Sequence, residues 1–144
     1  MSRSNPLIFA TAFLLVSIAA AAAPFDPAKD VSIAFHQGIL ELKVPTSVHL
    51  KQRFLKVELK SQSGSVTLGA LPPATGKDEL GDPVWHGRVR IPLQGEGLKD
   101  PVELLVTYQP CSEGANGVCY RPQHRTLIVK AAEFQRSHHF VNRW

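Results

Sequence analysis

The stretch that decides the fold is residues 104–129, which read LLVTYQPCSEGANGVCYRPQHRTLIV. Two apolar segments, 104–108 and 126–129, flank a loop that holds both cysteines of the chain, Cys111 and Cys119. Their β-branched and aromatic residues favour strands, and the Asn-Gly pair between the cysteines is typical of a tight turn. We therefore predict two antiparallel strands, with the cysteines at the two lips of a hairpin-like loop.

The same alternation of apolar and polar residues recurs along the chain after residue 23, in segments separated by Gly, Pro, Asn and Ser clusters. A helical period is missing there, apart from a short turn expected near residues 131–135. About seven short strands at turn-like intervals indicate an all-β fold, an immunoglobulin-like antiparallel β-sandwich. The expected strands are residues 31–35, 39–44, 54–59, 66–68, 84–91, 104–108 and 126–129.

The N-terminus has the pattern of a secretory signal peptide, because Arg3 precedes an apolar run that ends in small side chains. An uncleaved single-pass anchor is the alternative, but the run is rich in Ala and only just spans a membrane core of about 30 Å. We expect a signal peptide over residues 1–22, the sandwich domain over 23–133 and a C-terminal tail over 134–144. This arrangement predicts a periplasmic protein.

Length, net charge and histidine spacing limit the functions to be expected. After signal removal about 120 residues remain, enough to bury roughly two thirds of the unfolded surface without cross-links. The net charge of +4 is spread along the chain, so no nucleic-acid partner is expected. The six histidines follow no closed zinc spacing, and we expect them to be exposed imidazoles. We expect a monomer without a cofactor or a metal site.

The cysteine pair has two interpretations. A sandwich pin joins sequence-distant strands, so a pair this close together is not that pin. Opposed residues of an antiparallel pair lie about 4.5 Å apart at Cα, within disulfide range. A ring this small contributes only about 2.5 kcal/mol, which favours a redox pair. The alternative is a structural bridge in a non-catalytic binding or assembly module.

Exchange chemistry requires an exposed thiolate whose pKa lies near ambient pH. Arg121 and His124 closely follow Cys119 and would lower its pKa. The carboxylate of Glu113 would raise it if it lay nearby.

The cysteine motif resembles that of a known family. The run Val106-Thr107-Tyr108-Gln109, then Cys111, a Gly-containing loop and Cys119-Tyr120 with Pro122, is similar to the periplasmic N-terminal domain of DsbD-type thiol:disulfide interchange proteins. Residues 44–50 are similar to the family's early segment, and residues 78–81 to its cap loop. The resemblance implies an immunoglobulin-like domain that carries a redox-active cysteine pair.

The resemblance also implies a function and partners. The domain would take two electrons from a thioredoxin-like donor and pass them to oxidised periplasmic thiol proteins. Cys119 would form the mixed disulfide with a partner, and Cys111 would resolve it. Since the family's membrane-embedded conduit and thioredoxin-like domain have no counterpart in the sequence, a separate polypeptide is expected to supply the electrons.

The resemblance assigns further residues to the site. Asp78 and Glu79 occupy the positions of acidic side chains that tune the thiols, and Leu80 takes the place of an aromatic cap over the sulfurs. The residues that we expect to complete the set lie beside the cysteines: Tyr108, Tyr120 and His124. The sequence departs from the family in a longer loop between the cysteines, and in His49 and Leu50 within a Tyr-rich segment.

Overall fold

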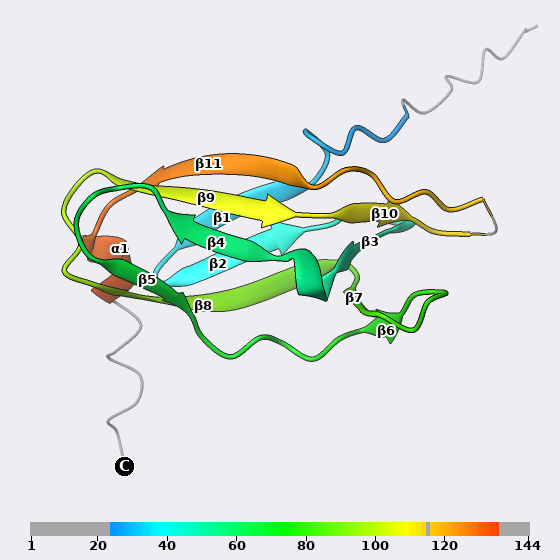
Figure 1. The fold of residues 1–144 in the computed structure, drawn as a ribbon, viewed down its shortest axis with the longest axis horizontal. Coiled ribbons are helices and arrows are strands. Elements are labelled where there is room, and N and C mark those ends of the chain that lie inside the picture. Colours follow the sequence, from blue (N-terminus) through cyan, green and yellow to red (C-terminus); the bar gives the residue numbers. More distant parts are fainter. Residues whose placement is uncertain (1–23, 115, 136–144) are drawn as a thin grey trace, which may run out of the picture.

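The structure, a computed structural model, describes residues 24–114 and 116–135 and is nearly all β (Figure 1). All of its paired strands are antiparallel, as predicted. The strands are β1 (Ser32–His36), β2 (Ile39–Lys43), β3 (Val48–Lys51), β4 (Lys56–Leu59), β5 (Ser65–Leu68), β6 (Gly76–Lys77), β7 (Pro83–Trp85), β8 (Arg88–Glu96), β9 (Val102–Tyr108), β10 (Pro110–Ser112) and β11 (Gln123–Val129). A 3-10 helix, η1 (Gln52–Phe54), and a short helix, α1 (Ala132–Gln135), complete the fold.

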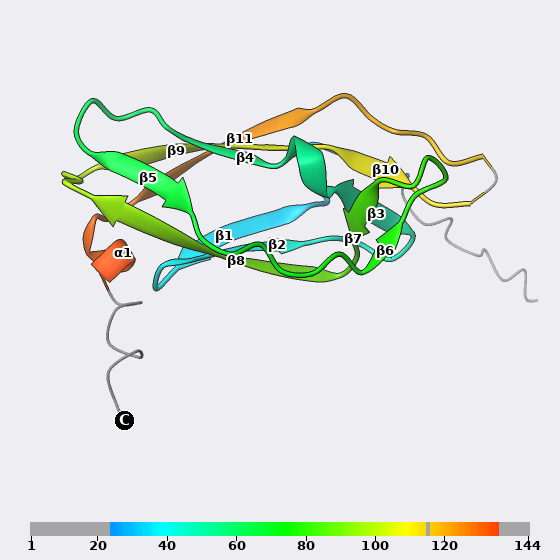
Figure 2. The same cartoon turned by 60° about the horizontal axis from the view of Figure 1, so that its bottom comes forward.

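Two sheets form the layers of a sandwich, one with strand order β1-β2-β8-β5 and the other with order β11-β9-β4 (Figure 2). Alternate side chains of each layer point inward, as Leu40 and Leu42 of β2 and Leu104 and Val106 of β9 illustrate, each with no exposed surface. The core therefore lies between the two inward faces. This arrangement confirms the predicted immunoglobulin-like sandwich.

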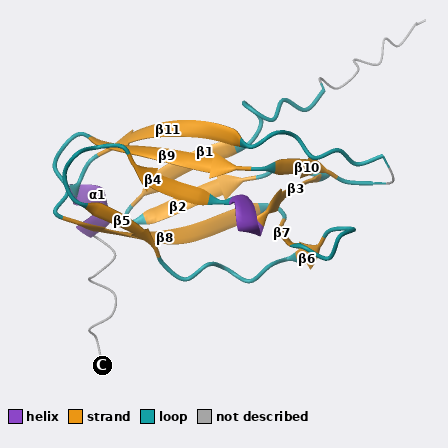
Figure 3. Cartoon of the chain, in the orientation of Figure 1, coloured by secondary structure: helices purple, strands orange, loops and turns teal. Residues whose placement is uncertain are grey.

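A third sheet, with order β10-β3-β7-β6, extends one end of the sandwich (Figure 3). β3 lies in its middle and pairs with β10 on one side and with β7 on the other. β9 leads into β10 through a single residue, Gln109, so the cysteine loop continues from a core strand into this end sheet. The end sheet positions the candidate site.

The expected strand over residues 84–91 is wrong as a single element. β7 and β8 belong to different sheets, and the chain turns between them at Gly87, whose φ is +67°. Glycine adopts this conformation without a steric penalty. The apolar alternation runs on across the break, so periodicity alone did not reveal it. Likewise β4 begins at Lys56 rather than at residue 54, because residues 52–54 form η1.

The chain ends bear on the predicted domain boundaries. The predicted signal peptide and the tail beyond residue 135 lie outside the described residues. Phe134, placed in the tail by the sequence analysis, is only 3% exposed and packs with its ring centroid 4.6 Å from that of Phe35. The packed domain therefore extends to this residue, and α1 agrees with the turn expected at 131–135. Within residues 24–114 and 116–135, no helix has the length and apolarity needed to cross a bilayer.

Candidate functional site

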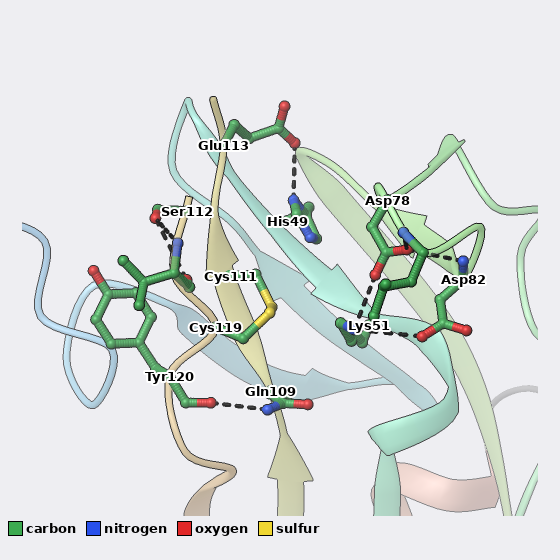
Figure 4. Close-up of a disulfide and its surroundings, with 12 residues drawn as sticks. His49, Lys51, Asp78, Asp82, Gln109, Cys111, Ser112, Glu113, Cys119 and Tyr120 are labelled. Atoms are coloured by element: carbon green, nitrogen blue, oxygen red, sulfur yellow. Dashed lines mark hydrogen bonds and ion pairs between the residues drawn. A yellow bond between two sulfur atoms is a disulfide. The ribbon is translucent and has the colours of Figure 1, made fainter. Parts of the chain in front are cut away.

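Cys111 and Cys119 form a disulfide with an S–S distance of 2.06 Å and a Cα–Cα distance of 4.0 Å (Figure 4). Cys111 lies on β10, where it pairs with His49 of β3, and it is 1% exposed. Cys119 forms an isolated β-bridge with Cys111 and is exposed. The geometry confirms the predicted bridge between the two lips of the loop, and it makes the two cysteines unequal in access to solvent.

Hydrogen bonds that do not involve sulfur hold the return segment against β10. The backbone N–H of Ser112 donates to the carbonyl of Val118 at 2.9 Å, and Val118 donates in turn to the Ser112 hydroxyl at 2.9 Å. Beyond the disulfide, Tyr120 donates to the carbonyl of Pro110, and the Gln109 side chain donates to the carbonyl of Tyr120. Backbone contacts on both sides therefore fix the position of Cys119.

A cavity of about 350 Å³ opens beside the disulfide. It lies between the cysteine loop, the centre of β3 and the segment that leads from β6 to β7. Five of the predicted site residues line it: Cys111, Cys119, Asp78, Glu79 and Leu80. Leu80 is 80% exposed, so this side chain borders the cavity without being packed down over the sulfurs.

The other three predicted site residues do not line this cavity. Tyr108 is 1% exposed and belongs to the sandwich core, because the alternation of β9 turns its ring inward. The Tyr120 ring packs against Phe25, with centroids 5.4 Å apart. His124 is exposed on β11 and shares a hydrogen bond of 2.9 Å with the Thr107 hydroxyl.

The segment from Asp78 to Asp82 is a tight, internally bonded turn. One carboxylate oxygen of Asp78 accepts hydrogen bonds from the backbone N–H groups of Leu80 and Asp82, both at 2.9 Å. Lys51 of β3 reaches the turn from below, with its Nζ 2.9 Å from the Asp78 carboxylate and 3.3 Å from that of Asp82 (Figure 4). The sequence analysis did not single out Lys51, which is 7% exposed.

This ion pair fixes two charges beside the cavity. Its hydrogen bond to Asp78 raises the pKa of Lys51, against the opposing effect of burial. The same hydrogen bond is the main reason why the pKa of Asp78 is lowered. The sequence analysis expected the negative charge of Asp78 to tune the thiols. In the structure this charge is compensated locally by Lys51.

A second polar cluster, which the sequence analysis missed, consists of His49, His86 and Glu113. The Nδ1 of His49 lies 3.0 Å from an oxygen of the Glu113 carboxylate, and the Nε2 of His86 contacts the same oxygen. These contacts lower the pKa of Glu113, and the hydrogen bond with His86 has the largest effect. Partial burial of the carboxyl group acts in the opposite direction. All three residues line the cavity.

The expectation of exposed imidazoles is wrong for His49, which is 8% exposed. Its ring lies beside that of His86, with the centroids 5.8 Å apart, and next to its cross-strand neighbour Cys111. Glu113 is 64 positions from His49 and 27 from His86, a spacing that matches no local motif. The order of the strands brings the three together, and the sequence pattern holds no signal for that order.

Comparisons with known proteins support the fold. The family model described as "Thiol:disulfide interchange protein DsbD, N-terminal" matches residues 19–131. The chain is similar to the reduced form of the Neisseria meningitidis DsbD N-terminal domain, with 18% identity, a TM-score of 0.55 and coverage of 74% of this chain and 89% of that one. It is also similar to a structure of the complex between the DsbD and PilB N-terminal domains of the same organism, with 17% identity, a TM-score of 0.50 and coverage of 72% and 85%. No curated protein matches the chain significantly.

Proposed function

This chain belongs to the family of N-terminal domains of the thiol:disulfide interchange protein DsbD, and from that premise we propose that it exchanges disulfides through Cys111 and Cys119. It takes electrons from a thioredoxin-like donor and passes them to oxidised periplasmic proteins. The single observation that carries this proposal is the unequal exposure of the two sulfur-bearing residues at the edge of a cavity.

Unequal exposure suits an exchange reaction, because a thiolate must approach a disulfide sulfur in line with the bond that breaks. Cys119 is exposed and open to such an approach, whereas Cys111 is 1% exposed. A partner therefore reacts at Cys119, and Cys111 is placed to act only within the domain. The exposed Leu80 leaves the cavity side of the disulfide open to a partner.

The reaction proceeds in two balanced steps. In the reduced domain the Cys119 thiolate attacks one sulfur of a partner disulfide, forms a mixed disulfide and releases the other partner sulfur as a thiolate. Cys111, as a thiolate, then attacks the sulfur of Cys119, restores the internal bond and releases the second partner thiol. Two electrons have moved from the domain to the partner. The reverse sequence, with a reduced donor, regenerates the two thiols.

The proposed tuning residues differ in their position and in their partners. The charge of Asp78 is neutralised by Lys51, so its contribution is to hold the turn from Asp78 to Asp82 in shape. Glu79 and Glu113 border the cavity and oppose ionisation of a nearby thiol, since a negative charge repels the thiolate and so raises the thiol pKa. His124 lies away from the cavity, so we assign it no tuning role.

One structural neighbour bears on the partner of this domain. It is a complex of a DsbD N-terminal domain with a PilB N-terminal domain, which supports a thioredoxin-like redox partner for this chain. We propose export to the periplasm with cleavage after residue 22, and a separate membrane protein as the source of electrons. Mass spectrometry of the exported protein tests the cleavage, which requires an N-terminus at Ala23.

A trapping experiment tests the roles of the two cysteines. Cys111→Ser leaves the exposed thiol of Cys119 without its resolving partner, and this variant should accumulate a mixed disulfide with oxidised glutathione. Cys119→Ser leaves only the buried thiol and should react at least about tenfold more slowly. Mass spectrometry of timed samples gives both rates. Equal rates in the two variants would show that the assigned roles are wrong.

The reduction potential separates this proposal from a structural bridge in a binding or assembly module. Equilibration of the oxidised protein with glutathione buffers, followed by a count of free thiols, gives the potential. An exchange domain should fall between about −200 and −270 mV, within reach of thioredoxin-like proteins. A disulfide whose reduction potential lies below about −300 mV, so that it stays closed in these buffers, would favour the structural module.

A further inference from the structure

The cluster of His49, His86 and Glu113 has a property that disulfide exchange does not require. One potential ligand atom from each residue, two imidazole nitrogens and one carboxylate oxygen, lies within 4.8 Å of the other two. The three come from different parts of the end sheet: β3, the residue after β7 and the residue after β10. We propose that this cluster is a binding site for a borderline divalent transition-metal ion, with Zn²⁺ as the representative case.

The donor set selects the class of ion. Imidazole nitrogens suit Zn²⁺, Cu²⁺ and Ni²⁺, whereas Mg²⁺ and Ca²⁺ prefer sites built from oxygen ligands. Two histidines and one glutamate are a known three-ligand set for Zn²⁺ that leaves a fourth position open. Here the open position faces the cavity, because all three residues line it.

His49 is the buried member of the cluster. It is 8% exposed, and its Nδ1 points toward the carboxylate of Glu113, as Figure 4 shows. His86 offers its Nε2 to the same carboxylate, while its Nδ1 shares a hydrogen bond of 2.8 Å with the Thr75 hydroxyl. A metal-binding histidine commonly has such a partner on its second nitrogen, because that contact sets the orientation of the ring.

The geometry requires only a small adjustment. Zn–N and Zn–O bonds of about 2.0–2.2 Å place tetrahedral ligand atoms roughly 3.3 Å apart. The Nδ1 of His49 and the Glu113 oxygen are already 3.0 Å apart. The remaining change falls on His86 and Glu113, whose side chains are 41% and 40% exposed. His49 thus acts as the anchor, and the two exposed ligands close around the ion.

The site would lie next to the redox pair without using it. Glu113 follows Cys111 by two residues, and His49 is the cross-strand neighbour of Cys111. Both cysteines are consumed in the disulfide, so the oxidised protein offers no thiolate to a metal. Metal binding to the oxidised protein can therefore be tested independently of the exchange function.

The test is a titration of the oxidised protein with ZnCl₂, in competition with a chromophoric chelator. All variants carry His138→Gln and His139→Gln, so that the C-terminal histidine pair contributes nothing. One ion should bind per chain at concentrations of about 100 μM or below. His86→Gln and Glu113→Gln should each weaken binding at least about tenfold. His36→Gln is the matched control, because His36 also faces a carboxylate, that of Glu133 at 3.5 Å, and should change nothing.

A second readout identifies the ligands directly. In ¹⁵N NMR spectra of the imidazoles, Zn²⁺ should shift the ring nitrogens of His49 and His86 and leave those of His36 and His124 in place. Absence of binding to the parent at about 100 μM would overturn the proposal. So would unchanged affinity in both His86→Gln and Glu113→Gln, which decide the matter even if His49→Gln fails to fold.

Discussion

Reduction of the disulfide between Cys111 and Cys119 should lower the free energy of unfolding by about 2.5 kcal/mol. The bond closes a ring with a sequence separation of 8. In the chain-entropy treatment, a ring of that size removes about 8 cal/mol/K from the unfolded state, which is about 2.5 kcal/mol near room temperature. For a domain of this size the melting temperature should fall by about 10 °C.

Reduction should lower the stability by its effect on the unfolded chain, and not by disturbing the folded structure. Hydrogen bonds between Ser112 and Val118, and between Tyr120 and Pro110, hold the loop without any contribution from sulfur. Pairing of β10 with β3 is also independent of the bond. The reduced domain should therefore keep its folded geometry, while its unfolded chain gains freedom.

The same free energy must appear in a second measurement. Folding and reduction form a thermodynamic cycle, so the stability difference equals the difference in reduction free energy between the folded and unfolded chain. A value of about 2.5 kcal/mol makes the folded disulfide about 55 mV more negative in potential than the same disulfide in denaturant.

The assay is guanidinium denaturation of the oxidised and reduced forms, followed by tryptophan fluorescence, in which the buried Trp85, 1% exposed, reports the unfolding of the core. Glutathione equilibration in native buffer and in denaturant gives the two potentials. The double variant Cys111→Ser/Cys119→Ser reports the open state without a reductant. A reduced form as stable as the oxidised form, or potentials that differ in the opposite sense, would refute the reasoning.

Three further predictions concern the turn beside the site and the core of the sandwich. Lys51→Met should lower the denaturation midpoint more than Lys56→Met, a change at an exposed position of β4. The reason is that Lys51→Met leaves Asp78 beside the cavity without its cation. The folded-state pKa of Asp78 is lowered, so its ion pair stabilises the fold above the ordinary carboxyl range near about pH 4 and is lost as the pH falls through the lowered value. Asp78→Asn should therefore flatten the acid limb of a plot of stability against pH, and an unchanged limb would contradict this. Phe134→Ala should cost about 3 kcal/mol in urea denaturation, whereas Ile128→Ala, at a site 65% exposed, should cost under about 0.5 kcal/mol; equal costs would place Phe134 outside the core.

The sequence by itself determined the layers of the sandwich and the place of the disulfide. Apolar alternation identified β1, β2, β9 and β11, because in a strand with one buried face every second side chain points to the core and is apolar. The two cysteines at the lips of a turn could be paired from local geometry alone, since the contact spans a sequence separation of only 8. Local periodicity and a short loop are properties that neighbouring residues carry themselves.

The tertiary structure alone decided what surrounds the disulfide. The order β10-β3-β7 buries His49 opposite Cys111 and brings it to His86 and Glu113, and no residue's neighbours in sequence encode that order. In the same way, the inward turn of β9 took Tyr108 into the core although it lies close to Cys111 in sequence. Nearness along the chain predicted the bond, whereas the packing of sheet neighbours from distant segments decided which charges and imidazoles face it.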